Sequence, residues 1–187
     1  KKMMGAWVGM DYDRGLAMLK AIAETGSVPS RLEFQGTAPF SGGPYVGVRN
    51  ACPMGDVGPT MGADMARLHA WLQEAGIEPT GAPFSIYHKW SPGKGRVEYT
   101  IATPVAKAPD STPAGIVSGT QADGTTYRVK HTGPYHHLGN AWSAGMMHGR
   151  AKRFKQDKSV HPFEIYENDP KEVAPNELVT VVHFPVK

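Results

Sequence analysis

Apolar residues recur along this chain at two different spacings, which separates predicted helices from predicted strands. Across residues 61–77 and 136–154 they recur every three or four positions, which predicts two amphipathic helices. Elsewhere, short runs rich in Val, Ile, Tyr and Phe, often alternating with polar residues, predict strands. The predicted strands are residues 44–50, 83–90, 96–105, 124–135, 162–170 and 178–187.

The two predicted helices each carry an apolar face that suits packing on a sheet. The first helix can end at Gly76, because glycine readily adopts the left-handed conformation that terminates helices. Its apolar face consists of Met61, Met65, Leu68, Trp71 and Leu72. The inward-facing candidates of the second helix are Leu138, Trp142, Met146 and Phe154.

A further helix is predicted near the N-terminus, over residues 11–24. Its apolar stripe consists of Leu16, Leu19, Ile22 and Ala23. The following sequence GSVPS is typical of a linker. We therefore divide the chain into an N-terminal helix with its linker (residues 1–35) and a main domain (residues 36–187).

The main domain contains an internal repeat. PFSIY at residues 83–87 returns as PFEIY at residues 162–166, and each copy is followed by a strand that ends in Pro-Val. Together with the preceding strands and helices, this predicts two copies of a β-α-β-β unit, over about residues 40–107 and 108–187. The predicted fold is therefore α+β, with antiparallel sheets around a central ligand cleft.

The repeat differs at one position, where Glu164 replaces the earlier Ser85. Side chains alternate along a strand, so Glu164 and Tyr166 point to one face and Phe163 and Ile165 to the other. We expect the face with Phe163 to pack on the helices. The face with Glu164 would then line the cleft.

Composition narrows the range of functions. The chain has 187 residues, a formal net charge of +3 and a single cysteine, Cys52. The small net charge gives no argument for nucleic-acid binding, and a single cysteine cannot form a disulfide within the chain. No long apolar run predicts a membrane helix and no secretory signal is visible, so we expect a cytoplasmic protein. We interpret the basic run GRAKRFKQDK, residues 149–158, as a solvated helix face and loop.

The order and spacing of several motifs resemble a known family. PYVGVR, LHAWLQEAGIEPTGAPFSIYH, EYTIATPV, HTGPYHHL and PFEIYENDP are similar to the GyrI-like family, also called the AraC or BmrR effector-binding domain. The resemblance runs from about Phe40 to Lys187 and implies a duplicated, SHS2-like fold. The N-terminal stretch of about 25 residues resembles the last helix of a START-type polyketide cyclase (SRPBCC) domain.

The resemblance implies three alternative functions. Family members bind amphipathic or cationic aromatic molecules, and some serve transcription regulators as sensor domains. Others resemble hydrolases that open strained cyclopropane rings, and others antagonise DNA gyrase. The acidic residue that the family places in its cleft corresponds to Glu164 here.

Chemistry supports a role for Glu164, because a buried carboxylate is costly unless it meets a cation or becomes protonated. We expect it to bind a ligand or, in the hydrolase alternative, to act in catalysis with Tyr166. An internal salt bridge to Arg49, Arg96 or Arg128 is the structural alternative. The further candidates for ligand binding are Phe40, Tyr45, Met65, Tyr87, Trp90, Tyr135, Trp142, Tyr166 and His183.

We expect no metal or other cofactor, since the histidines do not fall into a recognisable ligand spacing. Ser118, Ser143 and Cys52 also lack the sequence context of an activated nucleophile. The expected partner is an amphipathic or cationic aromatic small molecule, without direct contact to nucleic acid or membrane. A homodimer is left open.

Overall fold

The computed structural model describes residues 2–187, with the side chains of residues 2–7, 10, 11 and 92 left undescribed. Eight strands form one sheet in this part of the chain. The helices are α1 (Lys2–Thr25), α2 (Val57–Ala75) and α3 (Gly139–Arg150), with short 3-10 turns η1 (Met54–Asp56), η2 (Pro92–Lys94), η3 (Tyr135–His137) and η4 (Pro175–Glu177). The strands are β1 (Arg31–Phe40), β2 (Gly43–Pro53), β3 (Phe84–Ser91), β4 (Arg96–Pro104), β5 (Val117–Gln121), β6 (Gly124–Thr132), β7 (Phe163–Tyr166) and β8 (Val179–Val186).

The predicted duplication is confirmed. The strand order is β1-β6-β8-β7-β3-β4-β2-β5, so the units β2-α2-β3-β4 and β6-α3-β7-β8 meet where β3 pairs with β7. Every strand pairing is antiparallel. The two repeated segments, PFSIY and PFEIY, therefore lie beside each other at the centre of the sheet.

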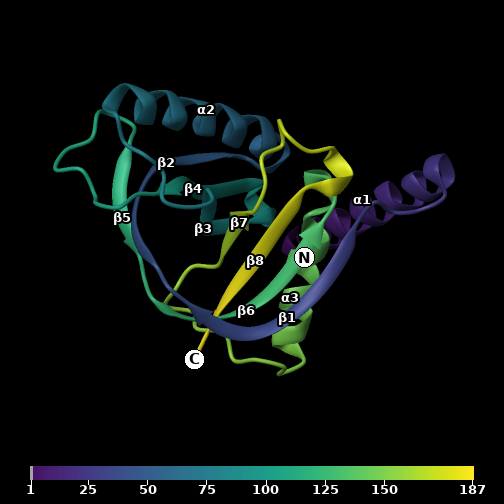
Figure 1. The fold of residues 1–187 in the computed structure, drawn as a ribbon. Helices are drawn as coiled ribbons and strands as arrows, with labels where there is room; N and C mark the ends of the chain where they lie inside the picture. Colours follow the sequence, from purple (N-terminus) through teal and green to yellow (C-terminus); the bar gives the residue numbers. More distant parts are fainter. Residues whose placement is uncertain (1) are drawn as a thin grey trace.

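The two outer strands are exchanged between the halves. β1 precedes the first unit but pairs with β6 of the second, whereas β5 precedes the second unit but pairs with β2 of the first. The chain passes from β1 to β2 next to the turn between β5 and β6, and a Cβ on Gly42 would lie 1.9 Å from the carbonyl oxygen of Gln121. This exchange draws the edges together and curves the sheet (Figure 1).

Both α2 and α3 cover the same face of the sheet. Leu68 and Leu72 of α2 pack with Val48 and Ile101, while Ala141 of α3 packs in a second cluster with Val182. Tyr87 and Tyr166 contact the first cluster from the same face. Glu164 lies on this face too, because it pairs across the sheet with Ser85 and Val182.

The expectation that the helices pack on the phenylalanine face was therefore wrong. Phe84, Ile86 and Phe163 form a separate cluster on the opposite face. The curvature of the sheet brings Phe40 and Tyr45 from the β1–β2 segment onto this cluster, so the sheet itself covers the phenylalanine face. Strand alternation was predicted correctly, but it does not determine which layer covers each face.

The end of a helix is predicted correctly where a residue such as glycine terminates it. Gly76 ends α2 in the left-handed conformation, at φ 65°, and its N–H donates to the carbonyls of Gln73 and Leu72. The second predicted helix is shorter than expected, since it is replaced by η3 at its start and ends at Arg150. On α1, the predicted stripe residues Leu16, Leu19 and Ile22 are exposed.

None of the helices in the described part of the chain is long and apolar enough to span a membrane.

Candidate functional site

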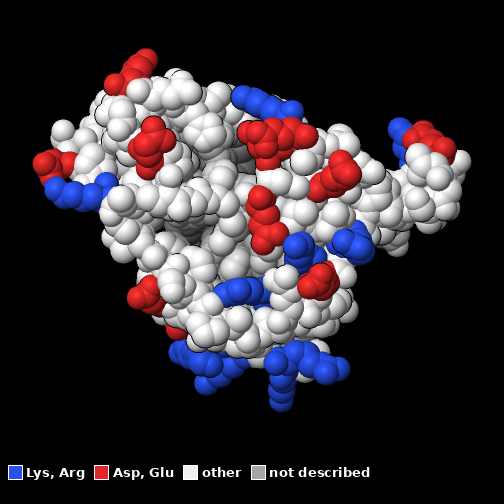
Figure 2. All heavy atoms as spheres, viewed as in Figure 1, with Lys and Arg blue, Asp and Glu red and all other residues white. Residues whose placement is uncertain are grey.

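A cavity of about 1610 Å³ lies on the helix face of the sheet, over β3 and β7. Its walls come from α1, α2, η3 and α3 and from the segment after β7. In Figure 2 the surface is hollowed beneath α2. The cavity is large enough for a drug-sized ligand.

Glu164 lies at the floor of this cavity and is only 2% exposed. Its Oε2 atom accepts hydrogen bonds from the hydroxyls of Tyr87 and Tyr166, each at 2.9 Å. Its Oε1 atom accepts a hydrogen bond from the indole N–H of Trp142. The carboxylate is thus held by three neutral donors, from β3, from its own strand and from α3.

The central strand pair explains why the repeat carries one serine and one glutamate. Ser85 and Glu164 are directly opposite each other where β3 pairs with β7. The Tyr166 hydroxyl lies 2.8 Å from Ser85 Oγ as well as near Glu164. Because a phenol has one proton, donation to Glu164 leaves Tyr166 to accept from Ser85. A second carboxylate at position 85 would instead face the first, with like charges opposed.

Burial and hydrogen bonding act on the pKa of Glu164 in opposite directions. Burial raises its pKa above the ordinary value, while the bonds from Trp142, Tyr166 and Tyr87 counteract part of the increase. The pKa values of both tyrosines are raised well above the ordinary value, chiefly by burial and then by the neighbouring Glu164 charge. Both phenols therefore remain protonated donors at neutral pH.

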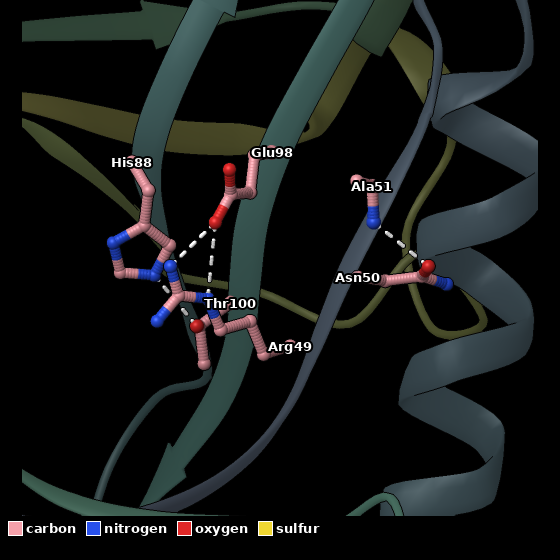
Figure 3. A network of polar contacts seen from close by, with 6 residues as sticks. All are labelled: Arg49, Asn50, Ala51, His88, Glu98 and Thr100. Carbon is pink, nitrogen blue, oxygen red and sulfur yellow. Dashed lines mark hydrogen bonds and ion pairs between the residues drawn. The ribbon is translucent and has the colours of Figure 1, made fainter.

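The internal salt bridge considered from the sequence does not form. Figure 3 shows Arg49 turned toward Glu98, with His88 and Thr100 beside the pair. The other two candidate arginines donate to backbone carbonyls, Arg96 to Ala51 and Arg128 to Pro39. Among the described residues, no ion pair includes Glu164.

Six of the further candidates for ligand binding line the cavity with Glu164. Tyr87 meets Trp142 edge to face at a centroid distance of 5.2 Å and Trp90 at 5.9 Å. Tyr135 meets Tyr166 at 5.9 Å. Trp90 and Tyr135 are 42% and 40% exposed and lie nearer to solvent than Glu164. The lining candidates are Met65, Tyr87, Trp90, Tyr135, Trp142 and Tyr166.

Phe40, Tyr45 and His183 are not part of this cavity, and their expected placement in the cleft is corrected. Phe40 packs on Phe163 at 4.8 Å, and the His183 ring stacks on Phe163 at 4.5 Å. Tyr45 meets Phe84 edge to face on the same side of the sheet. They lie on the opposite face because His183 pairs with Phe163 and the curved edge carries the other two over the phenylalanine cluster.

Sequence reasoning missed part of the lining. Met61 and Met146, which the sequence assigned to the packing faces of their helices, also border the cavity, as does Met147 of α3. Asp13 and Arg14 of α1 also contribute, and Arg14 donates to the carbonyl of Gly139 at 3.3 Å. The helical spacing of Met61 and Met65 was a usable signal, whereas nothing local indicates that α1 forms a wall.

The described side chains contain no group of three or more His, Cys, Asp or Glu that could hold a metal ion. The cavity is thus furnished with aromatic rings, thioethers and one deeply buried carboxylate. This arrangement can bind an apolar body and present a negative charge to it.

Comparison with known proteins agrees with this geometry. The sequence model of the GyrI-like small molecule binding domain family matches residues 43–187, well over half of the chain. No curated protein sequence matches at a significant level.

Several solved structures share the fold. EcmrR in its DNA complex aligns with a TM-score of 0.71 at 16% identity, over 96% of this chain and 66% of that longer chain. The EcmrR C-terminal domain aligns at 0.64 and 18% identity, over 84% and 98%. The part of this chain left outside the EcmrR alignment is 4%, which is much less than the 24 residues of α1. Most of α1 therefore lies within the aligned region.

Two further solved structures share the fold, one of a protein bound to a cation and one of a hydrolase. SAV2435, solved bound to tetraphenylphosphonium, aligns with a TM-score of 0.58 at 16% identity, over 83% of this chain and 94% of that one. A hydrolase encoded by lin2189 from Listeria innocua aligns at 0.55 and 10% identity, over 84% and 92%. At these identities the likeness concerns the fold.

Proposed function

This chain belongs to the GyrI-like small molecule binding domain family, and from that premise we propose that its cavity binds hydrophobic aromatic cations with Glu164 as the counter-ion. The domain would act as a multidrug or effector-binding module.

The observation that carries this proposal is a buried carboxylate that has no positive partner among the described side chains. Glu164 is almost fully buried, and the groups that hold it are two phenols and an indole. Three hydrogen bonds favour the ionised form but supply no positive charge. A cationic ligand would supply that charge inside a site of low polarity, where the attraction between opposite charges is strong.

The walls favour the same class of ligand. Tyr87, Tyr166 and Trp142 surround the carboxylate, and aromatic faces attract cations by roughly 0.5–2 kcal/mol for each good contact. Met61 and Met65 line the adjoining wall with flexible thioethers, which adapt to ligands of different shape. Aromatic and flexible walls together suit several related ligands better than one of fixed outline.

The neighbours are consistent with this chemistry. SAV2435 was solved with tetraphenylphosphonium, which is a bulky aromatic cation. EcmrR was solved in a complex with DNA, and this chain covers only 66% of that protein. We therefore propose that this chain takes part in transcription control only if it works with a separate domain that binds DNA. The cytoplasmic location, the gyrase alternative, the START-type resemblance of the N-terminus and the domain boundary at residue 36 stay predictions from the sequence. Whether the chain forms a homodimer stays open.

Two ions of equal shape and opposite charge give the sharpest test. Isothermal titration would compare tetraphenylphosphonium with tetraphenylborate, which has the same four rings but a negative charge. We expect the wild-type protein to prefer the cation by at least tenfold. Glu164→Gln should remove most of that preference, a loss of about 1.4 kcal/mol for each factor of ten.

Glu74→Gln is the matched control, since this exposed glutamate on α2 does not line the cavity. It should bind both ions as the wild type does. Equal affinity of the wild-type protein for the two ions, or an unchanged preference in Glu164→Gln, would refute the counter-ion role.

A second candidate function is hydrolysis of a strained cyclopropane. The observation that favours it is that Tyr87 and Tyr166 both donate to the same oxygen of Glu164, which forms a relay for protons. Glu164 would take a proton from water while the water oxygen bonds to a ring carbon. The breaking C–C bond would deliver its electron pair to a conjugated carbonyl, which Tyr166 would protonate before recovering a proton from Glu164.

Mass spectrometry of a cyclopropane-bearing alkylator after incubation with the protein tests this candidate. The product should gain one water, and Glu164→Gln or Tyr166→Phe should lower the rate at least a hundredfold. A rate equal to that of buffer, or turnover that survives both substitutions, would eliminate the hydrolase candidate while leaving ligand binding intact.

A further inference from the structure

A second hollow, separate from the floor around Glu164, lies at the C-terminal end of α3. It has a volume of about 880 Å³ and is formed by α3, the segment 152–158 and the end of β8. It shares only Met146 and Arg150 with the lining of the main cavity. We call it the basic pocket, after the cations on its rim: Arg150, Lys152, Lys155, Lys158 and Lys187.

The floor of the basic pocket is apolar and firmly packed. Phe154 stacks on Tyr127, with ring centroids 4.4 Å apart and planes 18° apart, and lies 5.9 Å from the Phe184 ring. Gly149 leaves room for Phe154, since a Cβ there would lie 3.3 Å from its ring. These rings are therefore held in place before any ligand arrives.

Backbone hydrogen bonds fix the rim relative to that floor. The N–H of Lys187 donates to the carbonyl of Lys155 at 3.0 Å, and the N–H of Asp157 donates to the carbonyl of Pro185 at 2.8 Å. The segment after α3 is thus paired with the end of β8, which carries Phe184 and is followed directly by Lys187. Lys152 adopts φ 56°, a left-handed conformation more usual for glycine at a helix end.

The charge on the rim is only partly balanced by nearby acids. Among the described residues, the five rim cations form no ion pair within 4.0 Å. Asp157 accepts hydrogen bonds from the N–H and hydroxyl of Ser159 at 2.9 and 2.6 Å, and its pKa is lowered chiefly by these bonds and also by the charge of Lys187. This one carboxylate therefore offsets part of the positive charge. In Figure 2 the positive side chains gather at the lower end of the molecule, where Figure 1 places the C-terminus and the segment after α3.

From this combination we propose that the basic pocket binds a small amphipathic anion, a phosphate or carboxylate attached to a short aromatic or alkyl body. The body would lie on Phe154 and Phe184, and the anionic group would meet the lysines of the rim. An apolar floor explains why the anion needs a body, and the excess of five cations over one nearby carboxylate, Asp157, explains its sign. The basic run around residues 149–158 is then a binding surface and not merely a solvated one.

This site is independent of the function proposed for Glu164, because the two pockets favour ligands of opposite charge. Titration with 1-naphthyl phosphate, inorganic phosphate and 1-naphthol tests it on the whole chain. We expect the phosphate ester to bind at least tenfold more tightly than either fragment. The double variant Lys155→Gln/Lys187→Gln should weaken its binding at least tenfold.

Two controls separate the site from general charge effects. Lys94→Gln/Lys107→Gln removes the same charge from exposed positions outside the pocket and should change affinity less than twofold. Glu74→Gln, at an exposed position of α2 outside both pockets, should leave binding of the ester unchanged. Circular dichroism checks that every variant is folded.

Four outcomes would overturn the proposal. The first is absence of ester binding at millimolar concentration, and the second is binding that survives the Lys155/Lys187 substitutions. The third is a patch that recognises charge alone, seen as inorganic phosphate binding as tightly as the ester. Tight binding of random duplex DNA at physiological salt, lost in the same variants, would equally reassign the surface to nucleic acid.

Discussion

If the main cavity binds a cation as proposed, the protonation of one carboxyl group, Glu164, should make that binding depend on pH. Burial raises its pKa, so a cation that needs the ionised form should bind less tightly as pH falls through that value. The Tyr87 hydroxyl lowers the pKa by donating to the carboxylate. Tyr87→Phe should therefore move the midpoint of cation binding to higher pH, because one of the hydrogen bonds that lower the pKa of Glu164 is lost.

Titration of tetraphenylphosphonium between pH 4 and 9 would measure this midpoint. Tyr135→Phe is the matched control, since Tyr135 lines the same cavity but no hydrogen bond from its hydroxyl to Glu164 is found among the described contacts. A midpoint that stays constant in Tyr87→Phe, or that moves equally in Tyr135→Phe, would contradict the role assigned to Tyr87.

At the scale of elements, α3 positions the Trp142 indole over Glu164 through very close packing on β8. A Cβ on Gly145 would lie 2.1 Å from the Phe184 ring, so this glycine allows the helix to approach the strand. Gly145→Ala should force the two elements apart and lower the free energy of unfolding by about 1–3 kcal/mol. It should also weaken cation binding, because Trp142 moves with the helix.

Gly62→Ala on α2 provides the comparison. Nothing lies within 4 Å of a Cβ at that position, and alanine is the better helix former. The unfolding free energy should therefore rise by roughly 0.5–1 kcal/mol. Urea denaturation of both variants would settle the sign of each effect, and a neutral Gly145→Ala would show that α3 does not depend on this close approach.

At the scale of the whole molecule, buried histidines should limit stability in acid. Burial lowers the pKa of His131 to about 4 and that of His183 to about 3, with the charge of Arg128 adding to the effect on His183. The unfolded chain then binds more protons than the folded one below about pH 6.5. The contribution of the neutral histidines to the free energy of unfolding is fully present above that pH. It is lost progressively as the pH falls toward the folded-state pKa values of about 4 and 3.

Each of these histidines contributes a slope of at most about 1.4 kcal/mol per pH unit. The His183 ring is hydrogen-bonded to the Thr126 hydroxyl. His183→Gln removes the titrating group, so the unfolding free energy should fall less steeply between pH 6 and 4. Thermal unfolding across this range would reveal the change. An exposed histidine offers the control, and His69→Gln should leave the slope as it is in the wild type.

The sequence by itself determined the duplicated β-α-β-β order, the end of α2 at Gly76 and the shared face of Glu164 and Tyr166. These features follow from the backbone period of two or 3.6 residues and from the conformational freedom of glycine, which are local properties. A repeat interrupted by one acid was also a local signal, and it led to Glu164, which lies in the lining of the main cavity.

Only the tertiary structure decided which groups meet that acid and which face the helices cover. The exchange of β1 and β5 curves the sheet, which places Phe40 and Tyr45 on the far face and leaves Tyr87, Trp142 and part of α1 around the cavity. Such contacts join segments far apart in the chain. Their geometry depends on strand register and sheet curvature, which no periodicity along one segment can encode.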